Sequence, residues 1–99
     1  MKVVYTQAAE TSLYSLNPQD HKAVLGKIKR FATSKPGQLS TLKIMKLHGF
    51  EPPVFSVRAT KDLRILFRYV QKHSVEILDV ARRERIKRIY RQLAERREI

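Results

Sequence analysis

The stretch 54–80 constrains the fold most, because three strand-like runs follow one another within it. The runs cover 54–58, 63–70 and 75–80, and all are rich in β-branched and aromatic residues that suit a half-buried pleated surface. The polar connections at 59–62 and 71–74 have the length of hairpin loops. The stretch therefore predicts an antiparallel meander.

Alternation along the middle run separates two faces of this predicted sheet. One face is apolar and would pack on a helix: Leu63, Ile65, Phe67 and Tyr69. The other face carries Arg64 and Arg68, and Arg58 of the preceding run can join it. A single arginine there is most simply a solvated residue. Several arginines converging on one sheet favour an anionic ligand.

The charge of the chain points to the same class of partner. The 99 residues carry 21 Lys and Arg against 9 Asp and Glu, a net charge of +12. Nucleic acid is the commonest partner for such a surface, although an acidic protein or an anionic membrane would also use it. We expect one domain over residues 1–99, in the cytoplasm and without a membrane partner, because no long apolar run or signal pattern is present.

The first third of the chain predicts a strand and a helical hairpin. Residues 2–5 form a short apolar run, and Thr6 is a suitable N-cap for a helix over 7–16. Asn17 and Pro18 fit the N-cap and first turn of a second helix that ends near residue 33. The expected core positions are Ala9, Leu13 and Leu16 in the first helix and Val24, Leu25, Ile28, Phe31 and Ala32 in the second.

The remaining segments predict a loop, an edge and a basic helix. Residues 34–38 have loop composition, and 42–47 form a strand or line the sheet edge. Residues 81–94 are almost entirely cationic outside an apolar helical stripe of Ile86, Ile89, Tyr90 and Leu93. Docking of this stripe on the sheet is favoured over a membrane surface. The predicted class is α+β: an N-terminal strand and a helical hairpin on a small antiparallel sheet, with a C-terminal basic helix.

Three segments stand out by their order and spacing: the Lys-Leu-His-Gly segment at 46–49, the Leu-Arg-Ile-Leu-Phe-Arg strand at 63–68, and the strand and Arg-rich turn at 77–85 followed by Tyr90. Together they resemble the RelE/ParE toxin superfamily of toxin–antitoxin systems. The order of strand, two helices, meander and basic tail also resembles this superfamily. The resemblance implies a small α+β fold and a cognate antitoxin, whose acidic, partly disordered segment would fold onto the basic surface.

In the RelE branch, the resemblance implies a ribosome-dependent endoribonuclease that inhibits translation by cleaving mRNA in the decoding site. The ribose 2′-OH attacks the adjacent phosphate, which requires a base, cations for the phosphorane and an acid for the leaving oxygen. By position, Arg64 corresponds to the arginine that stabilises the phosphate and Arg83 to the arginine after the last strand. Arg58 and Ser56 stand where the family has two basic residues, and Tyr90 is the candidate for its tyrosine.

Two positions depart from that pattern, and the base is left open. Ser56 cannot neutralise a phosphate. Tyr90 stands one residue beyond the expected position, a rotation of about 100° on a helix, and its place on the apolar stripe equally suits a structural role. Arginine stays protonated, whereas His48 has a suitable reference pKa of about 6.5 but is most simply a solvated turn residue.

Four further cations, Lys46, Arg68, Arg82 and Arg85, are expected to bind the RNA. Three scattered histidines without cysteines predict neither a metal site nor a cofactor. Two alternatives remain open: a ParE-like toxin that binds DNA gyrase and needs no acid or base, and a degenerate member that binds only RNA or its antitoxin.

Overall fold

The computed structural model describes residues 2–33, 43–47, 49–71 and 73–97. Over these residues the elements follow in the order β1 (Lys2–Tyr5), α1 (Gln7–Tyr14), α2 (Pro18–Thr33), β2 (Met45–Leu47), β3 (Val54–Arg58), β4 (Leu63–Val70), β5 (Ser74–Arg82) and α3 (Arg83–Arg97). The predicted loop at 34–38, together with Leu42 and His48, lies outside the described residues.

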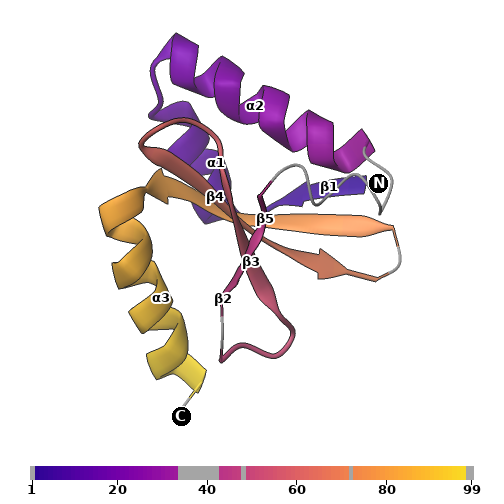
Figure 1. The fold of residues 1–99 in the computed structure, drawn as a ribbon, viewed down its shortest axis with the longest axis vertical. Coiled ribbons are helices and arrows are strands. Elements are labelled where there is room, and N and C mark those ends of the chain that lie inside the picture. The colour runs from indigo at the N-terminus through magenta and orange to yellow at the C-terminus, as the bar shows by residue number, and fades with distance from the viewer. Residues whose placement is uncertain (1, 34–42, 48, 72, 98–99) are drawn as a thin grey trace.

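The strands form one five-stranded sheet in the order β1-β5-β4-β3-β2 (Figure 1). Strands β2 to β5 pair antiparallel, which confirms the predicted meander. Strand β1 pairs with β5 in parallel, because the helical hairpin and the meander between them form a crossover connection. The predicted α+β class is confirmed, and the sheet is mixed rather than purely antiparallel.

Both helices of the hairpin begin at the predicted N-cap residues. The Ala9 N–H donates to Thr6 Oγ1 over 3.1 Å, and the Asp20 N–H donates to Asn17 Oδ1 over 2.8 Å. Helix α2 has the predicted bounds, whereas α1 ends at Tyr14, two residues early. At its end the helix tightens, because the Leu16 N–H donates to the Leu13 carbonyl three residues back over 3.3 Å, and Asn17 already serves as the next N-cap.

The core lies between the hairpin and one face of the sheet. Ala9 and Leu13 of α1 and Val24 and Ile28 of α2 are buried against sheet residues that include Val57, Leu63, Ile65, Phe67, Val75, Ile77 and Val80. The Phe67 ring contacts Phe55 and Tyr69, with centroids 5.7 and 5.6 Å away. The predicted apolar face of β4 is therefore the core face.

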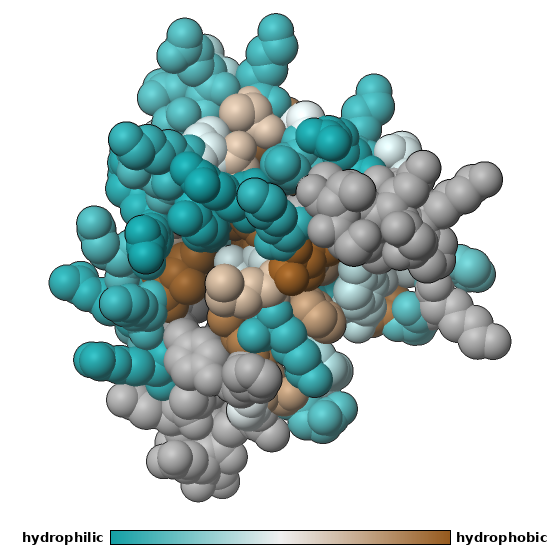
Figure 2. Space-filling model, viewed as in Figure 1, coloured by the Kyte–Doolittle hydropathy of each residue, from teal (hydrophilic) through white to brown (hydrophobic). Residues whose placement is uncertain are grey.

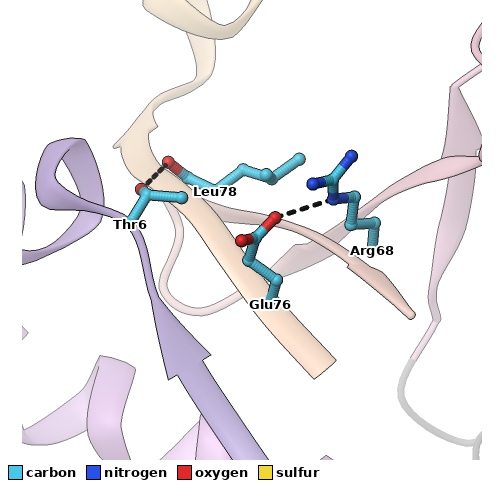
Figure 3. A network of polar contacts seen from close by, with 4 residues as sticks. All are labelled: Thr6, Arg68, Glu76 and Leu78. Carbon is cyan, nitrogen blue, oxygen red and sulfur yellow. Dashed lines mark hydrogen bonds and ion pairs between the residues drawn. The ribbon is translucent and has the colours of Figure 1, made fainter. Parts of the chain in front are cut away.

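A β-bulge in β5 breaks the regular alternation. Leu66 pairs with Asp79 but Phe67 pairs with Ile77, so Leu78 has no partner in β4. Thr6 binds the backbone there: its Oγ1 donates to the Leu78 carbonyl over 2.7 Å (Figure 3), and its N–H donates to the Ile77 carbonyl over 3.1 Å. Ser12 Oγ donates to Asp79 Oδ1 over 2.6 Å, so α1 is joined to β5 on both sides of the bulged residue.

Helix α3 starts where β5 ends and contacts β4 and β5. Its Ile86 is half-buried, whereas the side chains of Ile89, Tyr90 and Leu93 are not among those described. Docking of the apolar stripe on the sheet therefore stays a prediction for the residues that follow Ile86. None of the helices in the described ranges is long and apolar enough to cross a membrane.

Replacing Phe67 with alanine should lower the free energy of unfolding by about 3–5 kcal/mol, since a fully buried aromatic side chain leaves a cavity. Val70, on the same strand and 36% exposed, is the matched control, and Val70→Ala should cost under about 1 kcal/mol. Urea denaturation measures both. Equal losses in the two variants would contradict the observed register.

Replacing Ser12 with alanine should lower the free energy of unfolding by about 1–3 kcal/mol, because it removes a hydrogen bond from the nearly buried Asp79 carboxylate. Ser15 donates only to carbonyls of its own helix and is exposed, so Ser15→Ala should have little effect. Thermal unfolding at neutral pH compares the two. A Ser12→Ala variant as stable as Ser15→Ala would show that this contact does not hold α1 on β5.

Candidate functional site

The β3–β4 turn meets the junction between β5 and α3. The Arg83 N–H, at the first position of α3, donates to the Asp62 carbonyl in the turn over 3.0 Å. Arg58 and Arg64 flank this turn and are directly paired in the sheet. The contact therefore brings two arginines of the meander to the arginines at the start of the last helix.

These residues line a hollow of about 480 Å³, called here the basic hollow. Its lining consists of Arg58, Lys61, Asp62, Arg64, Arg82, Arg83 and Glu84. Five cations face two carboxylates, and no ion pair within 4 Å forms among them in the part of the chain that the structure describes. The hollow therefore carries an excess of positive charge that is available to an anion.

Arg64 is held in place by backbone oxygens of the turn. Its Nη1 donates to the carbonyls of Thr60, Lys61 and Leu63 over 3.2–3.3 Å. Arg58 Nε donates to the same Thr60 carbonyl over 3.2 Å. Among the described residues, Nε and Nη2 of Arg64 make no hydrogen bond, so these donors remain free for a ligand.

The arginines also repel one another. Partial burial lowers the pKa of Arg64, and the charges of Arg58 and Arg83 lower it further, while Asp62 opposes this effect. Arginine nevertheless stays protonated in proteins, so the lowered pKa of Arg64 reflects its burial and the neighbouring positive charges rather than a loss of its own charge. An anion bound in the basic hollow would relieve this repulsion.

The start of α3 adds to the same positive field. Arg83 and Arg85 lie in the first turn, where the partial positive charge of the helix N-terminus already disfavours cations. Glu84 is the acidic residue of that turn. Figure 2 shows hydrophilic side chains around the first turns of α3, at the left of the view. A turn with this composition is better suited to binding an anion than to starting a helix.

Arg68 and Lys46, two predicted RNA-binding residues, lie away from the basic hollow. Arg68 is four residues beyond Arg64, or about 13 Å along an extended strand, and its Nε donates to Glu76 Oε1 over 2.7 Å (Figure 3). Lys46 pairs with Phe55, which pairs with Phe67, so Lys46 lies on the helix-covered side of the sheet at its edge. Of the three arginines predicted to share one face of the sheet, Arg58 and Arg64 line the basic hollow and Arg68 does not.

Of the other predicted site residues, the structure describes the side chains of Arg82 and Arg85 but not those of Tyr90 and His48. Arg82 lines the basic hollow, but Arg85 lies on the opposite side of the first turn of α3, in hollows that include residues of α1. Tyr90 belongs to α3, about 10 Å along the helix from Arg83, and its side chain is not among those described. His48 lies outside the described residues. The RNA-binding roles of Arg82 and Arg85 and the catalytic roles of Tyr90 and His48 stay predictions.

Ser56 sits in the sheet rather than at its end. It is 8% exposed and pairs with Met45 and Leu66. The position where the family has a basic residue is therefore nearly buried here, and it presents no charge to the basic hollow.

Three residues of the basic hollow were not identified from the sequence: Lys61, Asp62 and Glu84. Lys61 and Asp62 lie in the turn between two predicted strands that each carry a candidate arginine, and this position could have identified them as site residues. Glu84 lies beside Arg83. A carboxylate can accept a proton from an attacking hydroxyl, so Asp62 and Glu84 are two candidate bases in the hollow.

No protein-family model and no curated protein matches the sequence, but solved structures do. A chain of the archaeal RelE–RelB complex from Pyrococcus horikoshii matches with a TM-score of 0.65 and 19% identity, over 85% of this chain and 96% of that one. A chain of the toxin–antitoxin complex RelBE2 from Mycobacterium tuberculosis matches with 0.65 and 26% identity, over 83% and 90%. Escherichia coli YafQ matches with 0.61 and 10% identity, over 86% and 96%.

The chain therefore has the fold of a class of small α+β toxins from toxin–antitoxin systems. Within that class it has the RelE-like superfamily fold, and the resemblance seen in the sequence is confirmed.

Replacing Arg83 with glutamine should stabilise the protein at low ionic strength by about 0.3–1 kcal/mol, because it removes a cation from a helix N-terminus crowded with arginines. The gain should shrink as salt is added. Arg91→Gln, at an exposed position further along α3, removes the same charge and should change stability less. Thermal unfolding over a salt series measures this. An Arg83→Gln variant that is destabilised at every salt concentration would contradict the repulsion.

Proposed function

We propose that the chain is the toxin of a toxin–antitoxin system and that it cleaves translated mRNA on the ribosome. The observation that carries this proposal is the convergence of Arg58, Arg64, Arg82 and Arg83 on one hollow without ion-pair partners in the described part of the chain. The RelE-like fold and the toxin–antitoxin complexes among its structural neighbours support it.

The proposed reaction is attack of a ribose 2′-OH on the adjacent phosphorus. A new O–P bond forms, the bond from phosphorus to the 5′-oxygen of the next nucleotide breaks, and one proton passes from the 2′-OH to that leaving oxygen. Arg64 is the best placed to bind the phosphate oxygens, since its Nε and Nη2 are free and its Nη1 is fixed by the turn. Arg58 and Arg83 then stabilise the additional charge of the phosphorane.

The proton acceptor must reach the same hollow. Asp62 and Glu84 line it, whereas His48 and the Tyr90 side chain lie outside the described residues. We assign phosphate stabilisation to the arginines and keep Asp62, Glu84 and His48 as candidate bases, with Tyr90 as the candidate acid. Glu84→Gln and Asp62→Asn, each compared with wild type over pH, test the two carboxylates.

A cognate antitoxin is the second part of the proposal. Chains of this fold are found in complexes named as toxin–antitoxin complexes. An acidic segment would complement the net charge of +12 and would block the basic hollow by occupying it.

Replacing Arg64 with alanine should abolish translation-coupled mRNA cleavage with little effect on the fold, because the side chain is bonded only to turn carbonyls. Lys22→Ala, which removes an exposed cation from α2, should cleave like wild type. The measurement is induction of each variant in a bacterial host without antitoxin, with 5′-end mapping of mRNA and circular dichroism of the purified proteins.

The same experiment separates the alternatives. Cuts inside translated codons that disappear with Arg64→Ala support the nuclease. Growth arrest with intact mRNA, DNA breaks and an SOS response would replace it with the gyrase-binding alternative, which the similarity to a YoeB/ParE toxin from Agrobacterium tumefaciens keeps in view. A properly folded wild-type chain that causes no arrest would point to a member that only binds RNA or its antitoxin.

A further inference from the structure

A second hollow of about 430 Å³ lies on the other side of the first turn of α3. One wall consists of Ser12 of α1 and its C-cap residue Ser15, and the other of Arg85 and Arg88 of α3. Arg82 and Glu84 line this second hollow and the basic hollow alike. The two hollows therefore adjoin at the end of β5 and together extend around the start of α3.

Positive charge also dominates the second hollow. Arg85 and Arg88 are one turn apart on α3, where like charges repel, and Arg82 immediately precedes the helix. None of the three forms an ion pair or a side-chain hydrogen bond within the described residues. Glu84 is the acidic residue of the lining, and the nearby Asp79 already accepts hydrogen bonds from Ser12 Oγ and the Val80 N–H.

The side chains that line the second hollow favour a ligand that accepts hydrogen bonds. The serine hydroxyls are engaged, Ser12 with Asp79 and Ser15 with carbonyls of its own helix, so the free donors are guanidinium N–H groups. Of the apolar residues in the lining, Leu63, Val80 and Ala81 are at most 3% exposed, and Leu16 is half-buried, so the lining offers an apolar side chain little more than one anchor. Repeated anionic groups on a flexible chain fit better than a peptide that needs apolar anchors.

We propose that the second hollow binds the phosphodiester backbone of nucleotides next to the scissile one, so that a single RNA strand runs from the basic hollow around the start of α3. This inference rests on the proposed function, because it extends the substrate bound there. Arg85 and Arg88 each contact one backbone phosphate, and the contact is independent of base sequence.

The test is the salt dependence of RNA binding by purified full-length protein. The ligands are a fluorescent trinucleotide and a fluorescent nonanucleotide, both 2′-O-methylated so that they cannot be cleaved. The variant Arg85→Gln/Arg88→Gln is compared with Lys87→Gln/Arg91→Gln, which removes the same charge from exposed α3 positions that line neither hollow.

For the nonanucleotide, the slope of log affinity against log salt should fall by about 1.4 in Arg85→Gln/Arg88→Gln, for about 0.7 per phosphate on a single strand. The control variant should keep most of the wild-type slope, and the trinucleotide should bind all three proteins alike. Equal losses in both double variants would overturn the second hollow as a site. So would no loss in either variant.

Two further measurements separate the possible failures. If poly-glutamate binding depends on Arg85 and Arg88 while nonanucleotide binding does not, the hollow belongs to an acidic protein segment and the inference is wrong. If mRNA cleavage by Arg64→Ala equals that by wild type, the proposed function fails regardless of the slopes. Arg64-dependent cleavage with unchanged slopes would overturn only the inference.

Discussion

The position of the arginines depends on how Thr6 holds the bulge in β5. Thr6 caps α1 through the Ala9 N–H and donates to the two backbone carbonyls that precede and follow the Leu78 Cα. The extra residue shifts the phase of the strand, so that Ile77 and Val80, three residues apart, both face the core. With regular alternation from Ile77, Val80 would face away from the helices and Ala81 toward them. The bulge thus sets where the strand delivers Arg82 and Arg83.

That placement has an energetic cost, which the turn at 59–62 partly offsets. Arginines gather beside the N-terminus of α3, and the pKa of Arg64 is lowered by its burial and further by the charges of Arg58 and Arg83. Carbonyls of Thr60, Lys61 and Leu63 accept hydrogen bonds from Arg64, and the Asp62 carbonyl accepts one from the Arg83 N–H. Backbone oxygens therefore substitute for the ion pairs that a stability-optimised surface would use, and they leave the outer guanidinium donors free.

Most of the fold could be predicted because its signals are local. Capping residues such as Thr6 and Asn17, the apolar periodicity of the helices and the alternation of β4 each act within a few residues. The bulge and the parallel pairing of β1 depend on contacts between distant segments, which no short pattern contains. The predicted end of α1 lies two residues too late, because the tightening of its last turn leaves no mark in the apolar periodicity.

The candidate site was predicted less completely, for the same physical reason. Arg58 and Arg64 could be paired from the meander alone. Their approach to Arg83 depends on one hydrogen bond between a turn and a helix start, and the separation of Lys46 depends on the pairing of an edge strand. Composition gave the sign of the charge but not its distribution. Arg68 is an example: composition includes it among the cations, but in the structure it forms an ion pair with Glu76.

The crowding of positive charge in the basic hollow also affects how the protein can be inhibited. The arginines that line the basic hollow repel one another. The binding free energy of any anion there therefore includes the relief of that repulsion as well as its direct contacts. The gain does not distinguish an RNA phosphate from the carboxylates of an acidic protein segment. Under the proposed function, the feature that binds substrate is therefore the feature that makes the toxin easy to inhibit. Selectivity between the two must come from outside the hollow, where apolar helix residues such as the partly exposed Leu25 can recognise a protein but not a phosphate backbone.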